Sequence, residues 1–400
     1  MNIGFEKPDL PHTHFLDNRI FTDDRVFSEE MTNIFAKVWL FVCHESEIAE
    51  PGDYRTTMAA GKPIVVVRGK DGDIRAMYNV CRHRAAPVVR EEAGNANGFR
   101  CFYHYWTYGL DGRLNGIAKP DGYSNVNLDK SKLGLVPVRC ESLAGLVFVC
   151  LDDDVEPLRE YLGDIVAPIM EPLGTVQMEA FHFHKKVVDC NWKLWQDNNS
   201  ERYHSFLHAI NRKTLPWVTG KTSPMKLRIG INGHSGYWSD GTAEVDYDAG
   251  GYSPMGEGAF PGLRDNEMRV INIFPDTMIN IRSNVCRIDR MVPLASGQTL
   301  VEWRGVGVKG DNAEMRAKRL RHHNMFWGPA GRNLAEDIIA VEAQWACMKA
   351  DAVRYSILAR EEDMNPTDDA NVRAYYQEWG RRMGRMASAP FDAAHAEAAE

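Results

Sequence analysis

Two short segments of the chain each pair one cysteine with one histidine. Cys81 and His83 are one residue apart, Cys101 and His104 are two residues apart, and residues 84–100 separate the pairs. Structural zinc sites usually take cysteines in pairs and histidines in pairs, unlike this arrangement. In a two-iron cluster, one iron can bind both thiolates and the other both imidazoles, which raises the reduction potential. The spacing therefore predicts a [2Fe–2S] cluster that passes single electrons, with a structural zinc site as the alternative.

A second segment, NWKLWQDNNSERYHSFLHAI at residues 191–210, indicates what such electrons are used for. If the segment is one helix, Asp197, Glu201, His204 and His208 lie on a single stripe. Two neutral imidazoles and one carboxylate on an iron(II) ion leave positions open for dioxygen and substrate. The alternative is a solvated polar face that carries an ordinary histidine pair. The motif HSFLH lacks the glutamate of the zinc-protease motif, so we do not expect a protease site.

In these motifs the sequence resembles the Rieske non-haem iron oxygenases, in particular the large (α) oxygenase subunits of the aromatic ring-hydroxylating type. The family's Rieske motif matches four residues followed by a tryptophan: Cys81, His83, Cys101, His104 and Trp106. Phe102 and Tyr105 stand where the family often has proline and glycine. The resemblance implies two cofactors, a [2Fe–2S] cluster and a mononuclear Fe(II) ion.

The family's iron motif, N-W-K…[DE]-N-x-x-[DE]-x-Y-H…H, matches the second segment in register and implies that His204 and His208 bind iron. The interval between them is shorter than is common in the family. A later segment, GPAGRNLAEDIIAVEAQ at residues 328–344, is similar to the family's GPAG…D…E…Q region and implies Asp337 as the third ligand. Its neighbour Glu336 has the same chemistry and is interpreted as an exposed helix charge.

The resemblance also implies roles beyond the metal ligands. Glu201 takes the place of the carboxylate that links the iron site to the cluster of a neighbouring subunit. Asn198, Trp327 and Asn333 occupy positions around the iron or in the substrate pocket, although each also fits an ordinary core or cap residue. A homotrimer is implied, with a small β subunit possible, and electrons come from a ferredoxin, an NAD(P)H-dependent reductase or both.

The composition narrows the class of protein. The 400 residues carry a net charge of −8 and an apolar fraction of 44%. A chain without a basic block is not expected to bind nucleic acid, and no run reaches the ~18 apolar residues of a membrane span. The first residues, MNIGFEKPDLPHTHF, lack the features of a secretory signal. With eight scattered cysteines, we expect a cytoplasmic protein with reduced thiols.

The pattern of apolar residues predicts the elements that position these motifs. We expect a helix over residues 22–39 with Thr22 or Asp23 as N-cap, a hairpin over 62–80, and a buried strand over 142–151. Further along, we expect a helix at 191–212, mostly strands at 226–310 and mostly helices at 312–360. The sequence GVGVKG at residues 305–310 matches a dinucleotide-binding motif in letters only, and we interpret it as a strand end and turn.

The expected fold class is α+β, and the resemblance implies its architecture. That architecture is an antiparallel β Rieske [2Fe–2S] domain and a catalytic domain with a curved antiparallel sheet covered by helices. Four ranges are expected: a helical segment at 1–40 that packs on the catalytic domain, the Rieske domain at 41–155, the iron domain at 156–388, and a loose tail at 389–400.

The expected function is that of a terminal oxygenase component that hydroxylates an aromatic substrate, such as an aromatic acid or amine. A first alternative is oxidative N-demethylation of a quaternary or N-methyl amine, for which an aromatic cage from Trp217, Tyr237 or Trp238 is expected. A second alternative, from another class, is a Rieske electron-transfer protein without oxygenase activity. The pairing of His204 and His208 with Asp337 argues against it, because a carrier needs no open second iron.

Overall fold

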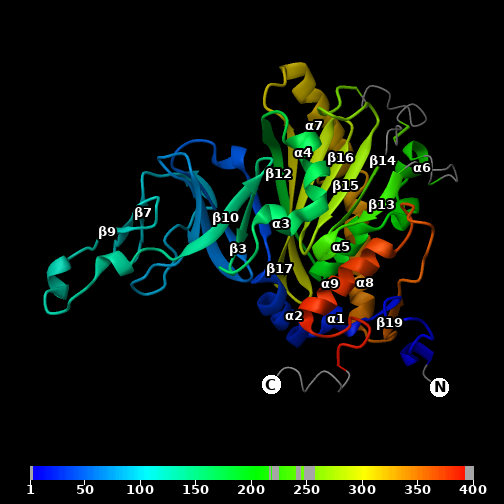
Figure 1. The fold of residues 1–400 in the computed structure, drawn as a ribbon, viewed down its shortest axis with the longest axis horizontal. Helices are drawn as coiled ribbons and strands as arrows, with labels where there is room; N and C mark the ends of the chain where they lie inside the picture. Colours follow the sequence, from blue (N-terminus) through cyan, green and yellow to red (C-terminus); the bar gives the residue numbers. More distant parts are fainter. Residues whose placement is uncertain (1–2, 216–217, 219–224, 240–244, 247–256, 392–400) are drawn as a thin grey trace. The chain divides into compact units, whose positions relative to one another are not determined.

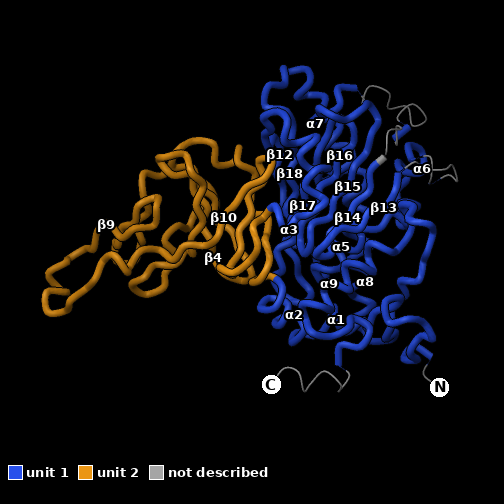
Figure 2. The backbone as a smooth tube through the Cα atoms, viewed as in Figure 1, with its two compact units in different colours: residues 1–34, 159–400 blue, residues 35–158 orange. Residues whose placement is uncertain are grey.

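The structure, a computed structural model, describes residues 3–215, 218, 225–239, 245–246 and 257–391. The chain divides into two compact units, residues 1–34 with 159–400 and residues 35–158 (Figure 2). Both are built on antiparallel sheets, which confirms the expected α+β class. None of the helices in the described ranges is long and apolar enough to cross a membrane.

The unit of residues 35–158 is a β structure. Its main sheet has the order β2-β11-β10-β5-β4-β3-β6, and a small sheet has the order β7-β8-β9. The strands of the main sheet are β2 (Leu40–His44), β3 (Asp53–Ala59), β4 (Lys62–Arg68), β5 (Ile74–Tyr78), β6 (Ala93–Asn95), β10 (Pro137–Leu143) and β11 (Leu146–Cys150). The small sheet consists of β7 (Phe99–Arg100), β8 (Thr107–Tyr108) and β9 (Leu114–Gly116).

Two strand predictions fall in this unit. The hairpin over residues 62–80 is confirmed, since β4 and β5 pair antiparallel. The prediction of one strand over residues 142–151 is wrong, because the segment turns at Ala144 and Gly145, which both have positive φ. The segment contains the end of β10 and all of β11. Its residues are mostly apolar, and the glycine is the only residue type in it that indicates a turn.

The larger unit contains a seven-stranded antiparallel sheet with the order β12-β18-β17-β16-β15-β14-β13 (Figure 1). Its strands are β12 (Met178–Val188), β13 (Met225–Ile229), β14 (Ser235–Ser239), β15 (Met268–Ile273), β16 (Thr277–Arg282), β17 (Val285–Ala295) and β18 (Gln298–Val308). The sequence GVGVKG lies at the end of β18 and the turn after it, which confirms its interpretation.

Helices of the larger unit cover this sheet. They include α3 (Leu158–Leu162), α4 (Val166–Leu173), α5 (Trp192–Ser200), α6 (Asn211–Thr214), α7 (Ala313–Trp327), α8 (Leu334–Lys349) and α9 (Ala370–Met383). Helices α5 and α7 both contact β17, and α5 also contacts α8 and α9. Helix α8, which carries Asp337, is therefore in direct contact with α5, the helix that precedes His204 and His208 in the chain.

The N-terminal segment adds short elements to the larger unit. These are β1 (Phe15–Asp17), which pairs with β19 (Tyr355–Ile357), and the helices α1 (Arg19–Thr22) and α2 (Asp24–Glu30). Asp23, one of the two expected N-caps, is the N-cap of α2. Its side chain accepts a hydrogen bond from the backbone N–H of Arg25. The helix predicted over residues 22–39 is too long, because α2 passes into a π-helical turn at Met31–Phe35 and β2 begins at Leu40.

Candidate metal centres

The two cysteine–histidine segments form loops with the same backbone. In the loops of residues 81–86 and 101–106, the cysteine N–H donates to the carbonyl five residues later, at 2.8 and 2.9 Å. The cysteine carbonyl accepts from the N–H four residues later, at 3.0 Å in both loops. The residue at that fourth position has positive φ in each case, 58° for Ala85 and 57° for Tyr105. The repeated conformation presents the two thiols and the two imidazoles in equivalent ways.

The backbone of Tyr105 shows how the loop tolerates one of the sequence's departures from the family pattern. It stands where relatives often have glycine, and its backbone still adopts the left-handed conformation that glycine favours. A residue with a side chain pays about 1–2 kcal/mol for this conformation. The residue is 58% exposed, so the larger side chain needs no space in the core. The loop therefore keeps the shape that the ligands require despite the substitution.

The four predicted cluster residues gather at the tips of these loops. Cys81 and Cys101 are buried, and burial raises the pKa of the Cys101 thiol. The rings of His83 and His104 lie edge to face with centroids 4.5 Å apart, and His83 stacks on Trp106 at 4.9 Å. The Nδ1 atom of His83 has no hydrogen-bond partner among the described residues. Two buried thiols beside two adjacent imidazoles fit the donor set of a two-iron cluster.

The segment that carries the second motif is not the single helix expected over residues 191–212. Helix α5 ends at Ser200, Glu201 is extended (ψ 159°), and a separate helical turn follows at Tyr203–Phe206. The Glu201 carboxylate accepts the backbone N–H of His204 at 3.0 Å. Such a bond from a side chain to the backbone competes with helix continuation. The one-stripe argument for these residues is therefore wrong, although they still meet in space.

His204, His208 and Asp337 form one compact group in the larger unit. One ligand atom from each lies within 4.8 Å of the other two. The Asp337 Oδ1 atom is 3.1 Å from His208 Nε2 and 3.6 Å from His204 Nε2. Burial by itself raises the pKa of Asp337, but hydrogen bonding and charge from His208, with His204 and Arg287, lower it overall. Two imidazoles and one ionised carboxylate fit the donor set of a mononuclear iron(II) site.

Each histidine of this group is held by a second carboxylate. His204 Nδ1 lies 2.6 Å from Glu201 Oε1, and His208 Nδ1 lies 2.7 Å from Glu336 Oε2. Burial lowers the pKa of His204, but the charges of Glu201 and Asp337 outweigh it and raise the pKa overall. Because each Nδ1–H donates to a carboxylate, both Nε2 atoms are left free to bind a metal ion.

The position of Glu336 corrects its interpretation as an exposed helix charge. Its side chain is only 36% exposed and its carboxylate orients His208. Asp337, one residue later on α8, is buried and faces both histidines. Neighbouring acids on one helix thus have different positions, because successive residues are about 100° apart around the axis.

We predict that Glu336→Ala lowers iron occupancy and turnover. Loss of a carboxylate that orients a ligand histidine typically costs about 10–100-fold in metal affinity or activity. Iron content measured after dialysis, together with product formed per chain, checks this expectation. Glu336→Gln should retain more of both, because its amide oxygen still accepts from His208 Nδ1. Unchanged iron binding in the alanine variant would contradict the orienting role.

The three remaining candidate residues also lie in the larger unit. Asn198, on α5, has a buried Oδ1 without a hydrogen-bond partner in the described chain. It lines a cavity of about 270 Å³ together with Glu201 and His204. Asn333 is the N-cap residue of α8 and is buried. Trp327 is buried at the end of α7, with the Arg287 guanidinium 5.2 Å from its ring.

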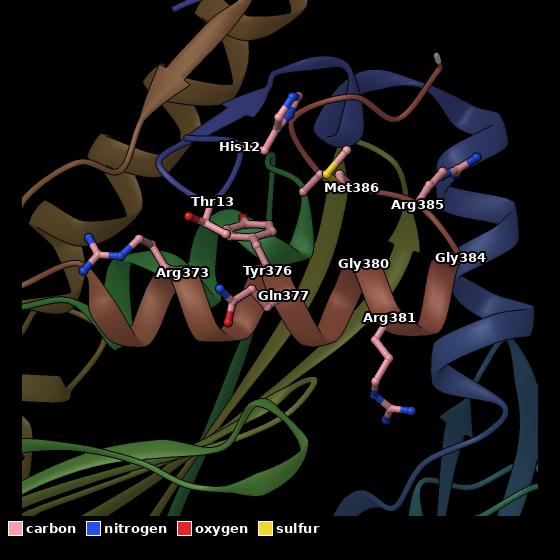
Figure 3. Close-up of a pocket in the computed structure, with 11 residues that line it drawn as sticks. His12, Thr13, Arg373, Tyr376, Gln377, Gly380, Arg381, Gly384, Arg385 and Met386 are labelled. Carbon is pink, nitrogen blue, oxygen red and sulfur yellow. The ribbon is translucent and has the colours of Figure 1, made fainter. Parts of the chain in front are cut away.

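Another cavity lies away from all seven predicted metal ligands. It has a volume of about 430 Å³ and is formed between α9 and the N-terminal segment that contains His12 and Thr13 (Figure 3). Tyr376 lines it, and the hydroxyl of that residue donates to Asp197 at 2.6 Å. Burial raises the pKa of Asp197 to about 7. Nothing in this cavity provides a metal-binding set, so it is not the candidate reaction site.

Sequence reasoning missed one residue next to the iron candidates. Arg202 is 5% exposed, and its Nε and Nη2 atoms have no hydrogen-bond partner among the described residues. It is near enough to Glu201 and Asp337 for their charges to act on its pKa. The only signal in the sequence is an arginine next to the ligand motif, which by itself reads as a surface charge.

Comparison with known proteins agrees with these two sites. Residues 38–128 match the Rieske [2Fe–2S] domain, and residues 173–385 match the catalytic domain of the ring-hydroxylating alpha subunit. A β unit with Rieske loops and a catalytic unit with a site of two histidines and one carboxylate define the large subunit of a Rieske oxygenase. The chain belongs to the ring-hydroxylating alpha-subunit family, and it is an oxygenase of the Rieske type.

Two relatives match nearly the whole chain. The 2-aminobenzenesulfonate 2,3-dioxygenase subunit alpha of Alcaligenes sp is 40% identical and is aligned over 96% of this chain and 98% of its own length. The methanesulfonate monooxygenase hydroxylase subunit alpha of Methylosulfonomonas methylovora is 37% identical over 96% of this chain and 94% of its own. A solved structure of naphthalene 1,2-dioxygenase is 23% identical, with a TM-score of 0.78 over 99% of this chain and 98% of its own, and shows the shared fold.

Membership of this family implies two iron cofactors. Proteins of this family hold a [2Fe–2S] cluster in the Rieske domain and a mononuclear iron in the catalytic domain. They act with a ferredoxin or reductase and form oligomers. The alternative of a pure electron carrier is therefore wrong for this chain, because the chain includes the catalytic domain.

Proposed function

We propose that this protein is the terminal oxygenase subunit for a small organic sulfonate, with an aromatic sulfonate as the preferred class. The observation that carries the proposal is the buried guanidinium of Arg202 beside the candidate iron ligands, whose Nε and Nη2 atoms have no hydrogen-bond partner among the described residues. This refines the expectation of an aromatic acid or amine, because a sulfonate is a permanently ionised acid group that can share a ring with an amine.

The chemistry of Arg202 favours an anionic substrate. A buried cation without a partner is costly, so an anion is expected to meet it when the protein is at work. Burial lowers the pKa of Arg202, yet a guanidinium remains charged in proteins. One face of the group lies over the Tyr237 ring, 5.4 Å from its centroid, while Nε and Nη2 remain available. These two donors form the fork that binds paired oxygens of an acid group.

The nearby Arg287 is already engaged with other side chains, which favours Arg202 as the residue that binds an incoming anion. Arg287 pairs with Asp289 at 2.6 Å and donates to Asn199 at 2.7 Å. The two relatives described above act, by their names, on 2-aminobenzenesulfonate and methanesulfonate. Both names contain the sulfonate group, and an unpaired guanidinium is the side chain that suits it.

The assignment of ligands is part of the proposal. Cys81, Cys101, His83 and His104 hold the [2Fe–2S] cluster, and His204, His208 and Asp337 hold iron(II). When bound, these groups deliver electrons singly and activate dioxygen at open iron positions. The chain's own residues hold both histidines through Glu201 and Glu336, keep the substrate's acid group at Arg202, and exclude water from a buried site. Asn198, Trp327 and Asn333 line the substrate side of this site.

The alternative of oxidative N-demethylation has less support. Tyr237 and Trp238 are successive residues of β14, so their side chains point to opposite faces of the sheet. They do not form one cage, and each ring already has a guanidinium over it, from Arg202 and Arg228. Trp217, the third cage candidate, lies outside the described residues, as does most of the tail expected at 389–400.

The assembly and the electron donors belong to the same proposal. We expect a cytoplasmic homotrimer, with or without a small β subunit, that is reduced by a ferredoxin or an NAD(P)H-dependent reductase. The cluster lies in the unit of residues 35–158, and the iron lies in the unit formed by the rest of the chain. We expect a neighbouring subunit to approach the iron site at the cavity beside Glu201 and His204.

A matched substrate series tests the proposal. In single turnovers of the chemically reduced protein, 2-aminobenzenesulfonate should give more product than 2-aminobenzoate, and aniline should give little. Arg202→Met should lower kcat/KM for the sulfonate about 10–100-fold, since a hydrogen bond to a charged group contributes about 1.5–3 kcal/mol. Its thermal stability should not fall, because the variant removes an unpaired buried charge.

The control is Arg228→Met, which removes an exposed arginine that also lies over an aromatic ring. It should leave kcat/KM unchanged for all three compounds. Equal turnover of aniline and the sulfonate, or an Arg202→Met variant that retains full sulfonate activity, would refute the assignment of substrate class without affecting the iron ligands.

A further inference from the structure

A second group of three potential metal ligands lies in the larger unit. It consists of His182 and His184 on β12 and His323 on α7, and one ring nitrogen of each lies within 4.8 Å of the other two. This group shares no residue with the candidate iron site or with the cluster loops. The function proposed above does not use it.

The sheet and α7 explain why the three imidazoles converge. His182 and His184 are two residues apart on β12, so their side chains point to the same face of the sheet. Their partners on β18 are Gly305 and Trp303. Trp303 stacks on His184, with ring centroids 4.8 Å apart and an interplanar angle of 19°. The tryptophan thus supports one side of the group and fixes the plane of one imidazole.

Gly305 provides the space into which His323 fits. A Cβ atom at this position would lie 3.1 Å from His182 Cβ and 3.1 Å from His323 Nδ1, which is closer than most real contacts. The ring of His323 meets that of His182 edge to face at 4.9 Å. A glycine within a strand often marks such a close approach. The close approach of His182 and His323 therefore explains why a glycine stands at position 305, the first glycine of GVGVKG. A dinucleotide-binding role is not needed to explain it.

The ring nitrogens of this group lack the partners that buried polar atoms normally have. His182 Nε2, both ring nitrogens of His184 and both of His323 have no hydrogen-bond partner in the part of the chain that the structure describes. Buried polar atoms are nearly always satisfied, so each exception calls for an unseen partner. Each neutral imidazole has one nitrogen with a free lone pair, and one nitrogen from each of the three rings lies within 4.8 Å of the other two. A single partner that accepts one lone pair from each ring would satisfy all three.

The imidazoles are in the protonation state that a metal requires. Burial lowers the pKa of His182, of His184 to about 4, and of His323 well below the ordinary value. They are therefore neutral near pH 7 and carry free lone pairs. The charge of Arg287 also lowers the pKa of His184 and His323, but Arg287 forms an ion pair with Asp289, which offsets that charge.

We propose that His182, His184 and His323 bind one divalent zinc-type ion, as a third metal site distinct from the iron–sulfur cluster and the mononuclear iron. Three neutral imidazoles without a carboxylate favour zinc over iron(II), and three histidines leave a fourth tetrahedral position open for water or an anion. At a bond length of about 2.0–2.1 Å, tetrahedral nitrogens are about 3.4 Å apart. Nitrogens already within 4.8 Å reach that spacing by small side-chain movements.

Element-specific measurements on the complete protein test the site, with Zn²⁺ as the probe. After exposure to Zn²⁺ and removal of the excess, the protein should hold about one zinc per chain in addition to its iron. X-ray absorption at the zinc edge should show nitrogen neighbours at about 2.0–2.1 Å with the outer-shell pattern of imidazole, and no sulfur. Because this readout detects zinc alone, the iron centres do not obscure it.

His184→Phe and His323→Phe should both lose this zinc. Each variant keeps an aromatic ring of similar volume and removes unpaired buried nitrogens, so folding should be preserved or improved. Thermal stabilisation by Zn²⁺ should be present in the wild type and absent in both variants. The matched control is His322→Phe, the neighbouring buried histidine on α7, whose Nδ1 bonds to Asn284 rather than to the group. It should keep the zinc.

Zinc at the iron site is distinguished by the Asp337→Ala variant. If the bound zinc persists in Asp337→Ala and disappears in His184→Phe, the proposed site holds it. If it disappears in Asp337→Ala and persists in His184→Phe, zinc has replaced iron and the proposal is overturned. No zinc in the wild type, or zinc with sulfur neighbours, also overturns it. None of these outcomes depends on the substrate class.

Discussion

Replacing Asp337 with alanine is expected to abolish oxygen-dependent product formation while leaving the visible spectrum of the cluster unchanged. Asp337 supplies the only carboxylate of the group that includes His204 and His208, and its Oδ1 lies 3.6 Å from His204 Nε2 and 3.1 Å from His208 Nε2. Losing a ligand should cost more than the about 10–100-fold that follows loss of an orienting carboxylate. Product per chain and absorbance of the same sample check both parts.

The control for this variant is Glu342→Ala. Glu342 is a carboxylate on the same helix, and it pairs with Lys186 at the surface, at 2.9 Å. It should retain iron and activity. Loss of the cluster spectrum in Asp337→Ala, or full activity without this side chain, would show that the third ligand lies elsewhere. Glu336→Ala is unsuitable as a control because Glu336 orients His208.

The second large effect is the recovery of activity when two inactive variants are combined in one oligomer. Cys101→Ser lacks a proposed cluster ligand and His204→Ala lacks a proposed iron ligand, so each alone should be inactive. If electrons cross between subunits, co-expressed chains should recover activity, because an intact cluster can face an intact iron across an interface. With random assembly in a ring, about one interface in four has the productive combination, which sets the expected fraction of wild-type activity.

Glu201 provides a further test of the same path. Its carboxylate holds His204 through two contacts, at 2.6 Å to Nδ1 and 3.0 Å to the backbone N–H. Glu201→Gln should keep both metal centres, since this side chain binds neither, and should turn over far more slowly. Mixed oligomers with verified subunit exchange and full metal content but no activity would place electron transfer within one chain.

Local sequence spacing predicted most of the candidate ligands. Cys81, His83, Cys101 and His104 lie within loops whose ends are fixed by short-range hydrogen bonds, so their spacing carries the geometry. Asp337 was reached only through the resemblance, because it is more than a hundred residues from the histidines and no local rule joins them. Tertiary contact between α5, α8 and the turn after α5 brings them together.

The roles of two charged residues could not be predicted from the sequence, because they depend on which side chains the fold buries. Arg202 and Glu336 look like surface charges in the sequence, and only the fold reveals that one is enclosed and the other paired. The helix expected over residues 191–212 failed for a related reason. Periodicity does not register that the Glu201 side chain takes the backbone N–H that would otherwise extend the helix.

The histidine group on β12 and α7 illustrates the same limit on a larger scale. His182 and His184 alternate along β12 in a way that a solvated strand also shows, and His323 lies far along the chain. Register with Gly305 and Trp303 on β18 places them together. A motif search based on residue spacing cannot find such a site, because strand pairing and tertiary packing bring its residues together and their spacing along the sequence does not.

The central claim is that one chain holds two different iron centres, and metal analysis tests it most directly. The purified protein should be red-brown, with about three irons and two acid-labile sulfides per chain. Asp337→Ala should hold about two irons and two sulfides, and Cys101→Ser about one iron and no sulfide. A colourless wild-type protein that contains zinc without iron or sulfide would contradict the account.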